Sequence, residues 1–209
     1  MNFTAADRGY MRRALRLAAL GLYTTTPNPR VGCVIARDGE IIGEGWHERA
    51  GGPHAEVVAL GAVETRKVGA GETAPTAENT PHDEQRLDAR GATAYVTLEP
   101  CAHFGRTPPC VDALIAAGVA RVVVAMTDPN PQVAGRGLAR LAAAGIAVDH
   151  GLCEAEAREL NPGFVARMTR GRPWLRLKIA ASLDGKTALA NGLSQWITGP
   201  AARRDAQVW

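Results

Sequence analysis

Side chains that bind soft metal ions occur in two separated segments of the sequence. His54 and Glu56 stand in a His-Ala-Glu motif at the start of an apolar helical pattern, Cys101 follows Pro100 after an apolar strand pattern, and Cys110 comes shortly afterwards. One imidazole and two thiolates are typical zinc ligands, and three protein ligands leave the fourth tetrahedral position open, as in catalytic sites. We therefore predict that His54, Cys101 and Cys110 bind Zn²⁺, with a water as the fourth ligand.

Glu56 is the predicted proton carrier of this site. Zinc lowers the pKa of a bound water to about 7, so hydroxide forms at neutral pH. Glu56 lies two residues after His54, a rotation of roughly 200° about an ideal helix, so both can face one ion only if a loop enters the first turn. Glu56 would then act as general acid and base without binding the metal, as in zinc deaminases.

The spacing of the two cysteines leaves alternatives open. Nucleoside and nucleic-acid deaminases use Pro-Cys-x-x-Cys, whereas here the longer segment Ala-His-Phe-Gly-Arg-Thr-Pro-Pro separates Cys101 from Cys110. One alternative is a deaminase of cytidine, guanine or tRNA adenosine. Another is a non-catalytic domain with a structural zinc closed by a fourth ligand such as His103, in which Glu56→Gln would have no activity to remove.

Composition limits the protein class. The chain has 209 residues, of which 46% are hydrophobic and 22% charged, enough for one compact domain or slightly more. No apolar run reaches the roughly 20 residues of a membrane span, and no secretion signal is evident, so we expect a cytoplasmic protein whose four cysteines stay free. A net charge of +3 without a Lys/Arg cluster argues against nucleic-acid binding and suits a phosphorylated small molecule.

Strand and helix patterns alternate along most of the chain. An amphipathic helix leads in from Asp7 and ends near Gly21, and a second helix opens at Pro53. Strands are predicted over residues 31–36, 40–45, 92–98, 121–126 and 146–150, the first two as a hairpin, and further helices over 111–117 and 137–144. This order predicts an α/β fold with helices packed on a largely buried sheet.

Two segments interrupt this order. Residues 65–90 are polar and lack aromatic side chains, which predicts a solvated loop insertion that can be deleted without loss of activity. Residues 161–173 are predicted as a linker that follows a domain over residues 1–160. Residues 174–181 then look like a new β-strand, and residues 174–209 are too few to close a core of their own.

Five motifs together resemble the deaminase half of the bifunctional riboflavin-biosynthesis deaminase/reductase family. They are Thr26-Pro-Asn-Pro-Arg-Val-Gly32, His54-Ala-Glu56, Leu98-Glu-Pro-Cys-Ala-His103, Gly105-Arg-Thr-Pro-Pro-Cys110 and Asp128-Pro-Asn-Pro-Gln-Val-Ala-Gly-Arg-Gly137. The resemblance spans residues 5–160. It implies a cytidine-deaminase-like three-layer fold with a mixed central sheet.

The resemblance also implies a reaction. The family removes ammonia hydrolytically from 2,5-diamino-6-ribosylamino-4(3H)-pyrimidinone 5′-phosphate and forms 5-amino-6-(5-phosphoribosylamino)uracil. By the resemblance, Asn28 would meet the pyrimidine edge and Arg106 the ribose phosphate, for which a guanidinium is well suited. His47 and His103 are further candidates for the substrate pocket.

Residues 178–185 and 192–199 resemble the opening of the family's reductase domain, which has a dihydrofolate-reductase-like fold and uses NADPH. By the resemblance, Ala180 and Trp196 would contact the nucleotide and Ser194 the ribosyl substrate. We expect the 209-residue chain to deaminate without reducing, because NADPH would bind only to a complete reductase domain. The apolar side chains after Trp174 would also allow copies of the chain to associate into a homo-oligomer.

Overall fold

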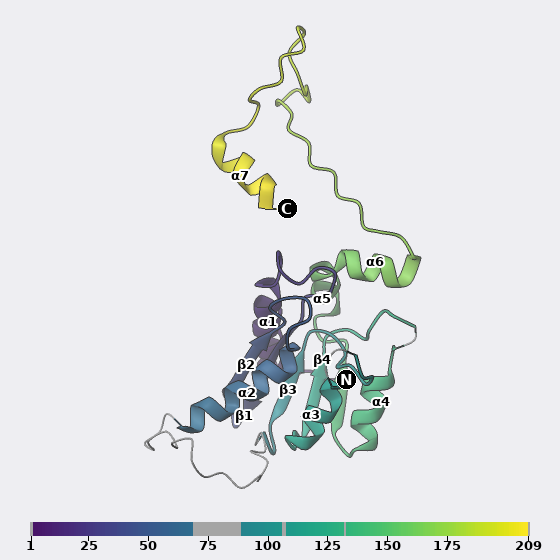
Figure 1. The fold of residues 1–209 in the computed structure, drawn as a ribbon. Coiled ribbons are helices and arrows are strands. Elements are labelled where there is room, and N and C mark those ends of the chain that lie inside the picture. Colours follow the sequence, from purple (N-terminus) through teal and green to yellow (C-terminus); the bar gives the residue numbers. More distant parts are fainter. Residues whose placement is uncertain (1, 69–88, 106–107, 132, 209) are drawn as a thin grey trace, which may run out of the picture. The chain divides into compact units, whose positions relative to one another are not determined.

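The computed structural model describes residues 2–68, 89–105, 108–131 and 133–208. It divides into two compact units, Met1–Arg172 and Pro173–Trp209 (Figure 1). The strands of the first unit are β1 (Gly32–Arg37), β2 (Glu40–Trp46), β3 (Thr93–Val96), β4 (Arg121–Val124) and β5 (Ala147–His150). Its helices are α1 (Ala5–Ala19), α2 (Ala55–Val68), α3 (Cys110–Ala116), α4 (Arg136–Ala143), α5 (Glu154–Leu160) and α6 (Pro162–Arg170).

The five strands form one mixed sheet in the order β2-β1-β3-β4-β5. β1 pairs antiparallel with both β2 and β3, whereas β3, β4 and β5 run parallel to one another. β1 and β2 form the predicted hairpin, and each later strand is reached through a helical connection, as parallel pairing requires. The mixed sheet predicted from the family resemblance is therefore confirmed.

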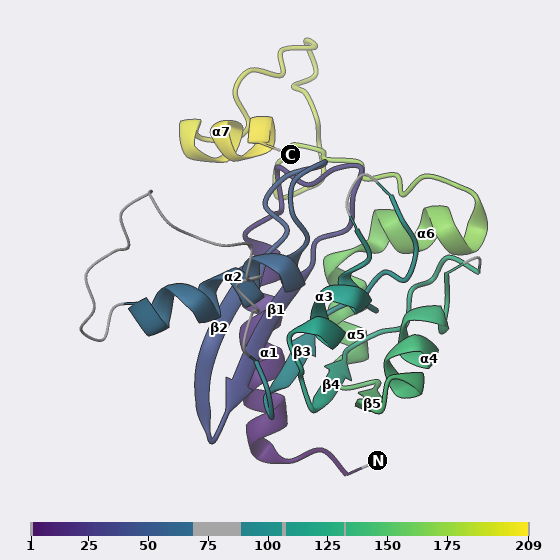
Figure 2. The ribbon, with the colours of Figure 1, turned by 60° about the horizontal axis from the view of Figure 1, so that its bottom comes forward.

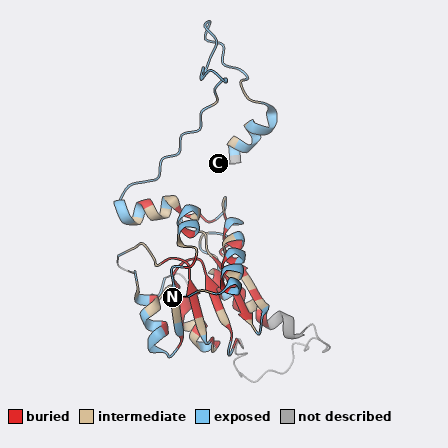
Figure 3. Ribbon diagram, turned by 180° about the vertical axis from the view of Figure 1, so that it is seen from behind, coloured by how far each residue is buried: buried red, intermediate tan, exposed pale blue. Residues whose placement is uncertain are grey.

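Helices cover both faces of this sheet, and the three-layer prediction is confirmed. On one face Leu60 of α2, Leu114 of α3 and Leu141 of α4 are fully buried against the strands. On the other face Met11 of α1 and Ala157 of α5 are fully buried. Figure 2 shows α2 lying across β1 and β2, and Figure 3 shows the buried residues concentrated in the strands between the helices.

A partly buried group of charges fixes α1 against the sheet near the amino end of β4. The Asp7 carboxylate accepts hydrogen bonds from the Tyr95 hydroxyl at 2.8 Å and from Arg121 at 2.7 Å, and Arg121 also pairs with Asp149 at 2.8 Å. Burial raises the pKa of Asp7, but hydrogen bonds from Thr4, Tyr95 and Arg121 outweigh burial and lower the pKa to about 2. We call Asp7, Tyr95, Arg121 and Asp149 the amino-end cluster.

Glycines let two helices lie directly on the sheet. A β-carbon at Gly32 would lie 2.0 Å from the carbonyl oxygen of Ala14 in α1. On the opposite face, a β-carbon at Gly43 would lie 2.3 Å from the carbonyl oxygen of Ala59, and one at Gly45 would lie 2.5 Å from the Ala59 nitrogen. These positions of β2 therefore set the height of α2 above the sheet.

The two segments predicted as loop and linker differ from expectation. The loop was predicted to begin at residue 65, but α2 continues through this polar sequence to Val68. Residues 69–88 of the predicted loop lie outside the described residues. Within the predicted linker, α6 places Phe164 against the core of the first unit.

The second unit contains one helix among its described residues, α7 (Pro200–Val208). The predicted strand over residues 174–181 does not form, and this prediction is wrong for the structure. A strand needs a neighbour for its backbone hydrogen bonds, and in the described part of the chain no segment pairs with these residues. None of the described helices of either unit has the length and apolarity to span a membrane.

Candidate active site

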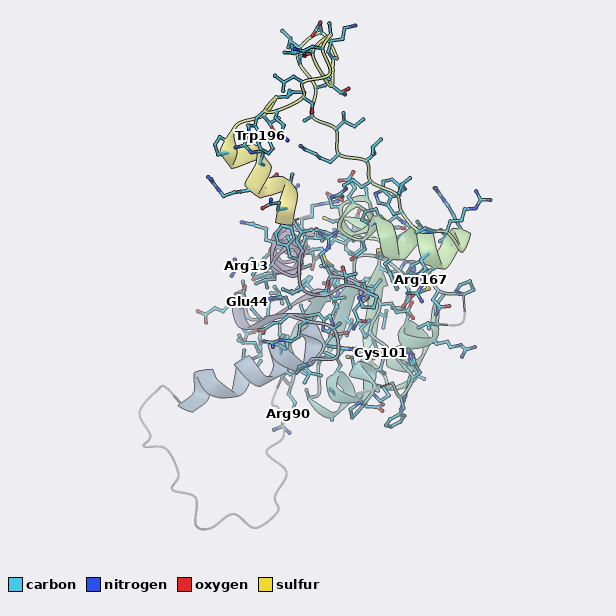
Figure 4. All side chains as sticks on the ribbon, turned by 45° about the horizontal axis from the view of Figure 1, so that its top comes forward. Arg13, Glu44, Arg90, Cys101, Arg167 and Trp196 are labelled. Carbon is cyan, nitrogen blue, oxygen red and sulfur yellow. The ribbon has the colours of Figure 1, made fainter. Side chains whose placement is uncertain are left out.

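Three metal-binding side chains that are distant in sequence meet beyond the carboxyl end of β3. One donor atom each from His54, Cys101 and Cys110 lies within 4.8 Å of the other two. His54 precedes α2, Cys101 follows β3 and Cys110 is the first residue of α3, so three different elements supply the donors. Figure 4 labels Cys101 on the first unit.

The spacing of these donor atoms suits a tetrahedral zinc ion. Nδ1 of His54 lies 3.1 Å from the Cys110 sulfur and 3.6 Å from the Cys101 sulfur. Ligands bound at about 2.0–2.3 Å on a tetrahedral ion are roughly 3.5 Å apart, and imidazole with two thiolates is a typical zinc donor set. Both the distances and the chemistry of the donors therefore fit Zn²⁺.

Hydrogen bonds within the cluster distribute its protons unevenly. The hydrogen bond from the Cys110 thiol lowers the pKa of Cys101 and raises the pKa of Cys110. The backbone N–H of Cys110 also donates to the Cys101 sulfur at 3.3 Å, which favours the thiolate there. The hydrogen bond to Cys101 raises the pKa of His54 against the effect of burial. The arrangement already stabilises one thiolate.

Glu56 lies in the first turn of α2, directly after the loop that carries His54. α2 begins at Ala55, so His54 stands outside the helix while its carbonyl oxygen accepts the backbone N–H of Val58 at 3.1 Å. This is the loop entry that the spacing of His54 and Glu56 required. The Glu56 side chain is buried, burial raises its pKa, and its carboxyl group hydrogen-bonds with Cys110.

A pocket of about 260 Å³ opens beside the donor cluster. Asn28 and His47 line it, and His47 is held in one tautomer: the Pro53 carbonyl oxygen, 2.9 Å from Nδ1, can only accept, so Nδ1 carries the proton. Nε2 of His47 then accepts from the amide nitrogen of Asn28 at 3.1 Å. This pair leaves the amide oxygen of Asn28 as an acceptor for the pocket.

Of the other two predicted substrate residues of the first unit, the structure describes only one. His103 is exposed and lines the same pocket. Arg106 lies outside the described residues. For the roles of His103 and Arg106, as for those of Asn28 and His47, the sequence argument remains a prediction.

The predicted residues of the reductase-like segment lie in the second unit. Ser194 and Trp196 line one hollow of that unit, and Ala180 is not among its lining residues. Trp196 is largely exposed and lies under the guanidinium of Arg203 from α7, 4.3 Å from the ring centre (Figure 4 labels Trp196). Their roles toward NADPH and substrate also remain predictions.

Sequence reasoning missed part of the pocket wall. Asp128, Asn130 and Val133 line the pocket from the segment that follows β4, and Phe164 lines it from α6. Burial raises the pKa of Asp128. The sequence contains a signal for the first three, because they lie in the motif that begins Asp128-Pro-Asn-Pro. For Phe164, a single aromatic in a segment predicted as a linker, it contains none.

Comparison with family models gives a match over this part of the chain. The model described as "Cytidine and deoxycytidylate deaminase zinc-binding region" matches residues 4–126, which include all three donor residues and Glu56. The chain belongs to this family. A second model, the RibD C-terminal domain, matches residues 173–208. The family is zinc-binding, in agreement with the donor set described above.

Curated relatives agree with the bifunctional resemblance. The riboflavin biosynthesis protein RibD of Escherichia coli K12 is 61% identical over 202 residues, which are 97% of this chain and 49% of that protein. RibD of Haemophilus influenzae is 54% identical over 207 residues, 99% of this chain and 50% of that protein. The resemblance to the riboflavin deaminase/reductase family is confirmed, and the chain spans about half the length of the curated relatives it matches.

Solved structures show the same fold. Acinetobacter baumannii RibD, 53% identical, matches with a TM-score of 0.80 over 98% of this chain and 51% of that one. A diaminohydroxyphosphoribosylaminopyrimidine deaminase/5-amino-6-(5-phosphoribosylamino)uracil reductase from Thermotoga maritima, 41% identical, matches with a TM-score of 0.81 over 97% of this chain and 52% of that one. The cytidine-deaminase-like fold predicted for the first unit is thereby confirmed.

Proposed function

We propose that this chain hydrolyses 2,5-diamino-6-ribosylamino-4(3H)-pyrimidinone 5′-phosphate to 5-amino-6-(5-phosphoribosylamino)uracil and ammonia, a step of riboflavin biosynthesis. The observation that carries the proposal is the convergence of His54, Cys101 and Cys110 beside the buried carboxyl of Glu56. The substrate comes from the similarity to RibD, since one solved relative is named as the deaminase and reductase of this pyrimidine.

His54 Nδ1 and the sulfurs of Cys101 and Cys110 would hold the zinc ion. When bound there, zinc lowers the pKa of a water from about 16 to about 7, so a hydroxide nucleophile is available at neutral pH. The hydrogen bonds of His54 and of the Cys110 backbone N–H hold these donors in place. The residues of the site can therefore bind the ion and keep it next to Glu56.

Glu56 would move the protons of the reaction. Deamination adds water across the double bond between the ring carbon that bears the amino group and the adjacent ring nitrogen, and then breaks the bond from that carbon to the amino nitrogen. The Glu56 carboxylate takes a proton from the water and delivers it to the adjacent ring nitrogen. It then takes the proton of the newly added hydroxyl and transfers it to the departing amino nitrogen, so that the carbon–nitrogen bond breaks, ammonia leaves and a ring carbonyl remains.

Pocket side chains would orient the pyrimidine. Asn28, whose amide nitrogen is committed to His47, presents its oxygen to an N–H of the ring edge. His103 and Arg106 are proposed to face the ribose phosphate, which suits a histidine at the open rim of the pocket and an arginine. In a complete reductase domain, Ala180 and Trp196 are proposed to contact NADPH and Ser194 the ribosyl substrate.

An ammonia-release assay with total-metal analysis tests the proposal. The purified chain is loaded with Zn²⁺ and offered the ribosylaminopyrimidine phosphate, cytidine and guanine in parallel. We expect about one zinc per chain and ammonia from the ribosylaminopyrimidine phosphate alone. Equal or faster release from cytidine or guanine would replace the proposed substrate, and zinc binding without any ammonia release would favour a structural zinc site.

A further inference from the structure

Glu99 is a buried carboxylate that accepts hydrogen bonds from four backbone N–H groups. Its Oε2 accepts from Asp128 and Gly135, both at 3.0 Å, and its Oε1 accepts from Gly137 at 2.8 Å and Leu138 at 3.4 Å. The residue is only 4% exposed. All four donors belong to the described residues of the segment 128–138, that is 128–131 and 133–138, whereas Glu99 itself stands two residues before Cys101.

This contact replaces the missing cap of α4. The residue before the helix is Gly135, which has no side chain to accept the free N–H groups of the first turn. Glu99 supplies the acceptor from a distant part of the chain, and its negative charge is favourable at the positive end of the helix dipole. The beginning of α4 therefore depends on a side chain from the strand end that leads to the metal donors.

Close backbone packing reinforces the same junction. A β-carbon at Gly137 would lie 2.1 Å from the carbonyl oxygen of Pro100 and 3.1 Å from Oε1 of Glu99. Glycine thus allows α4 to rest against the residue that precedes Cys101. The carboxylate and this contact together fix where the segment 128–138 lies relative to the donor cluster.

The fixed segment forms one wall of the substrate pocket, through Asp128, Asn130 and Val133, and Glu99 itself lies beside this wall in the pocket lining. We infer that Glu99 is a positioning residue for substrate recognition: it holds this wall at a set distance from the metal donors. The inference rests on the proposed function for its kinetic readout. It gives Glu99 a role in substrate affinity that is separate from zinc binding and from proton transfer by Glu56.

Glu99→Gln is the sharpest change, because it preserves the shape of the side chain. Gln carries one oxygen and one NH₂ group, so two of the four backbone N–H groups would face a donor in place of an acceptor. We expect KM for the ribosylaminopyrimidine phosphate to rise at least about tenfold, with kcat and zinc per chain retained. The matched control is Glu154→Gln, which removes only an exposed ion pair with Arg158.

Two further measurements separate this role from general destabilisation. Amide exchange of Gly135 and Gly137, followed by NMR without substrate, should become at least about tenfold faster in Glu99→Gln. Gly137→Ala retains the Glu99 carboxyl group, but its methyl group would crowd both the Pro100 carbonyl oxygen and Oε1 of Glu99 and push α4 away, so it should raise KM in the same way. A protein that was merely less stable would show a smaller active fraction at unchanged KM.

Three results would overturn the inference: unchanged KM with unchanged amide exchange in Glu99→Gln, loss of zinc in that variant, or a loss of kcat at constant KM. If the wild-type chain releases no ammonia, the proposed function fails. The amide exchange of Gly135 and Gly137 then still decides whether Glu99 holds the segment, because that measurement needs no substrate.

Discussion

The two ends of the parallel strands carry buried and partly buried polar groups of opposite character. In the amino-end cluster, Asp7 and Asp149 both face Arg121, and the Tyr95 hydroxyl donates to Asp7. At the carboxyl end of β3, His54, Cys101 and Cys110 direct their donor atoms toward one another beside Glu56. The first cluster contains its own counterion, whereas the donor set of the second is one that coordinates a cation.

This difference separates stability from activity. Removing a partner from a buried pair leaves the other charge without compensation and destabilises the fold. A cluster of metal donors instead holds side chains that contribute to activity only when an ion and a substrate bind. Changes at the carboxyl end should therefore affect turnover and changes at the amino end should affect unfolding, and four experiments test this division.

Metal removal should have the largest effect. A chelator that strips zinc from His54, Cys101 and Cys110 should lower ammonia release by at least about a thousandfold, because a zinc-activated nucleophile contributes several kcal/mol. Adding Zn²⁺ back should restore the rate. Full activity in protein that metal analysis shows to be zinc-free would contradict a role of the donor cluster in zinc-dependent turnover.

Glu56→Gln should come next. The variant keeps the size of the side chain but cannot carry protons, so deamination should fall at least about a hundredfold while zinc content stays constant. Glu154→Gln, an exposed change on α5, is the control and should leave the rate unaltered. An equal rate in Glu56→Gln and the wild type would remove Glu56 from the mechanism.

Asp7→Asn should act on stability and leave turnover unaffected. The folded-state pKa of Asp7 is about 2 against an ordinary value of 3.8, so the ionised group contributes about 2–3 kcal/mol to the unfolding free energy above pH 4. This contribution declines as pH falls from about 4 toward 2. Urea unfolding at several pH values should show a gap between wild type and variant that narrows in acid. A gap independent of pH would contradict this account.

Asn161→Ala should have the smallest effect. The Asn161 side chain accepts from the backbone N–H of Arg30 at 2.8 Å and donates to the carbonyl oxygen of the same residue at 2.9 Å. Loss of both bonds should lower the unfolding free energy by about 1–3 kcal/mol. Because Arg30 adjoins the pocket loop with Asn28, KM should rise slightly, as steady-state kinetics would detect. A large fall in kcat would show that Asn161 affects catalysis and not only stability and substrate affinity.

The sequence predicted what local pattern and a few motifs encode. The hairpin of β1 and β2, the helix that opens after His54 and the positions of β3, β4 and β5 all follow from apolar periodicity and turn residues. The donor residues were predicted because their side-chain types are few and chemically distinctive. All of this information is carried by residue identity at short range.

Long-range contacts could not be predicted in the same way. Glu99 was one letter of a motif, and nothing local indicates that its carboxylate caps a helix beginning at Arg136. Phe164 was assigned to a linker because a short polar helix has a weak pattern, yet it lines the pocket. The strand expected over residues 174–181 failed because strand propensity needs a pairing partner that the described residues do not supply.

The two glycines of β2 that contact α2 affect how inactivating substitutions should be interpreted. The helix that bears the proton carrier rests on bare backbone at Gly43 and Gly45. A methyl group at either position would lift that helix and tilt its first turn, and with it the carboxyl oxygen, away from the sulfurs. Such an alanine substitution would fall at a buried strand position that is neither a metal donor nor Glu56, and it would still inactivate the enzyme through the displaced helix.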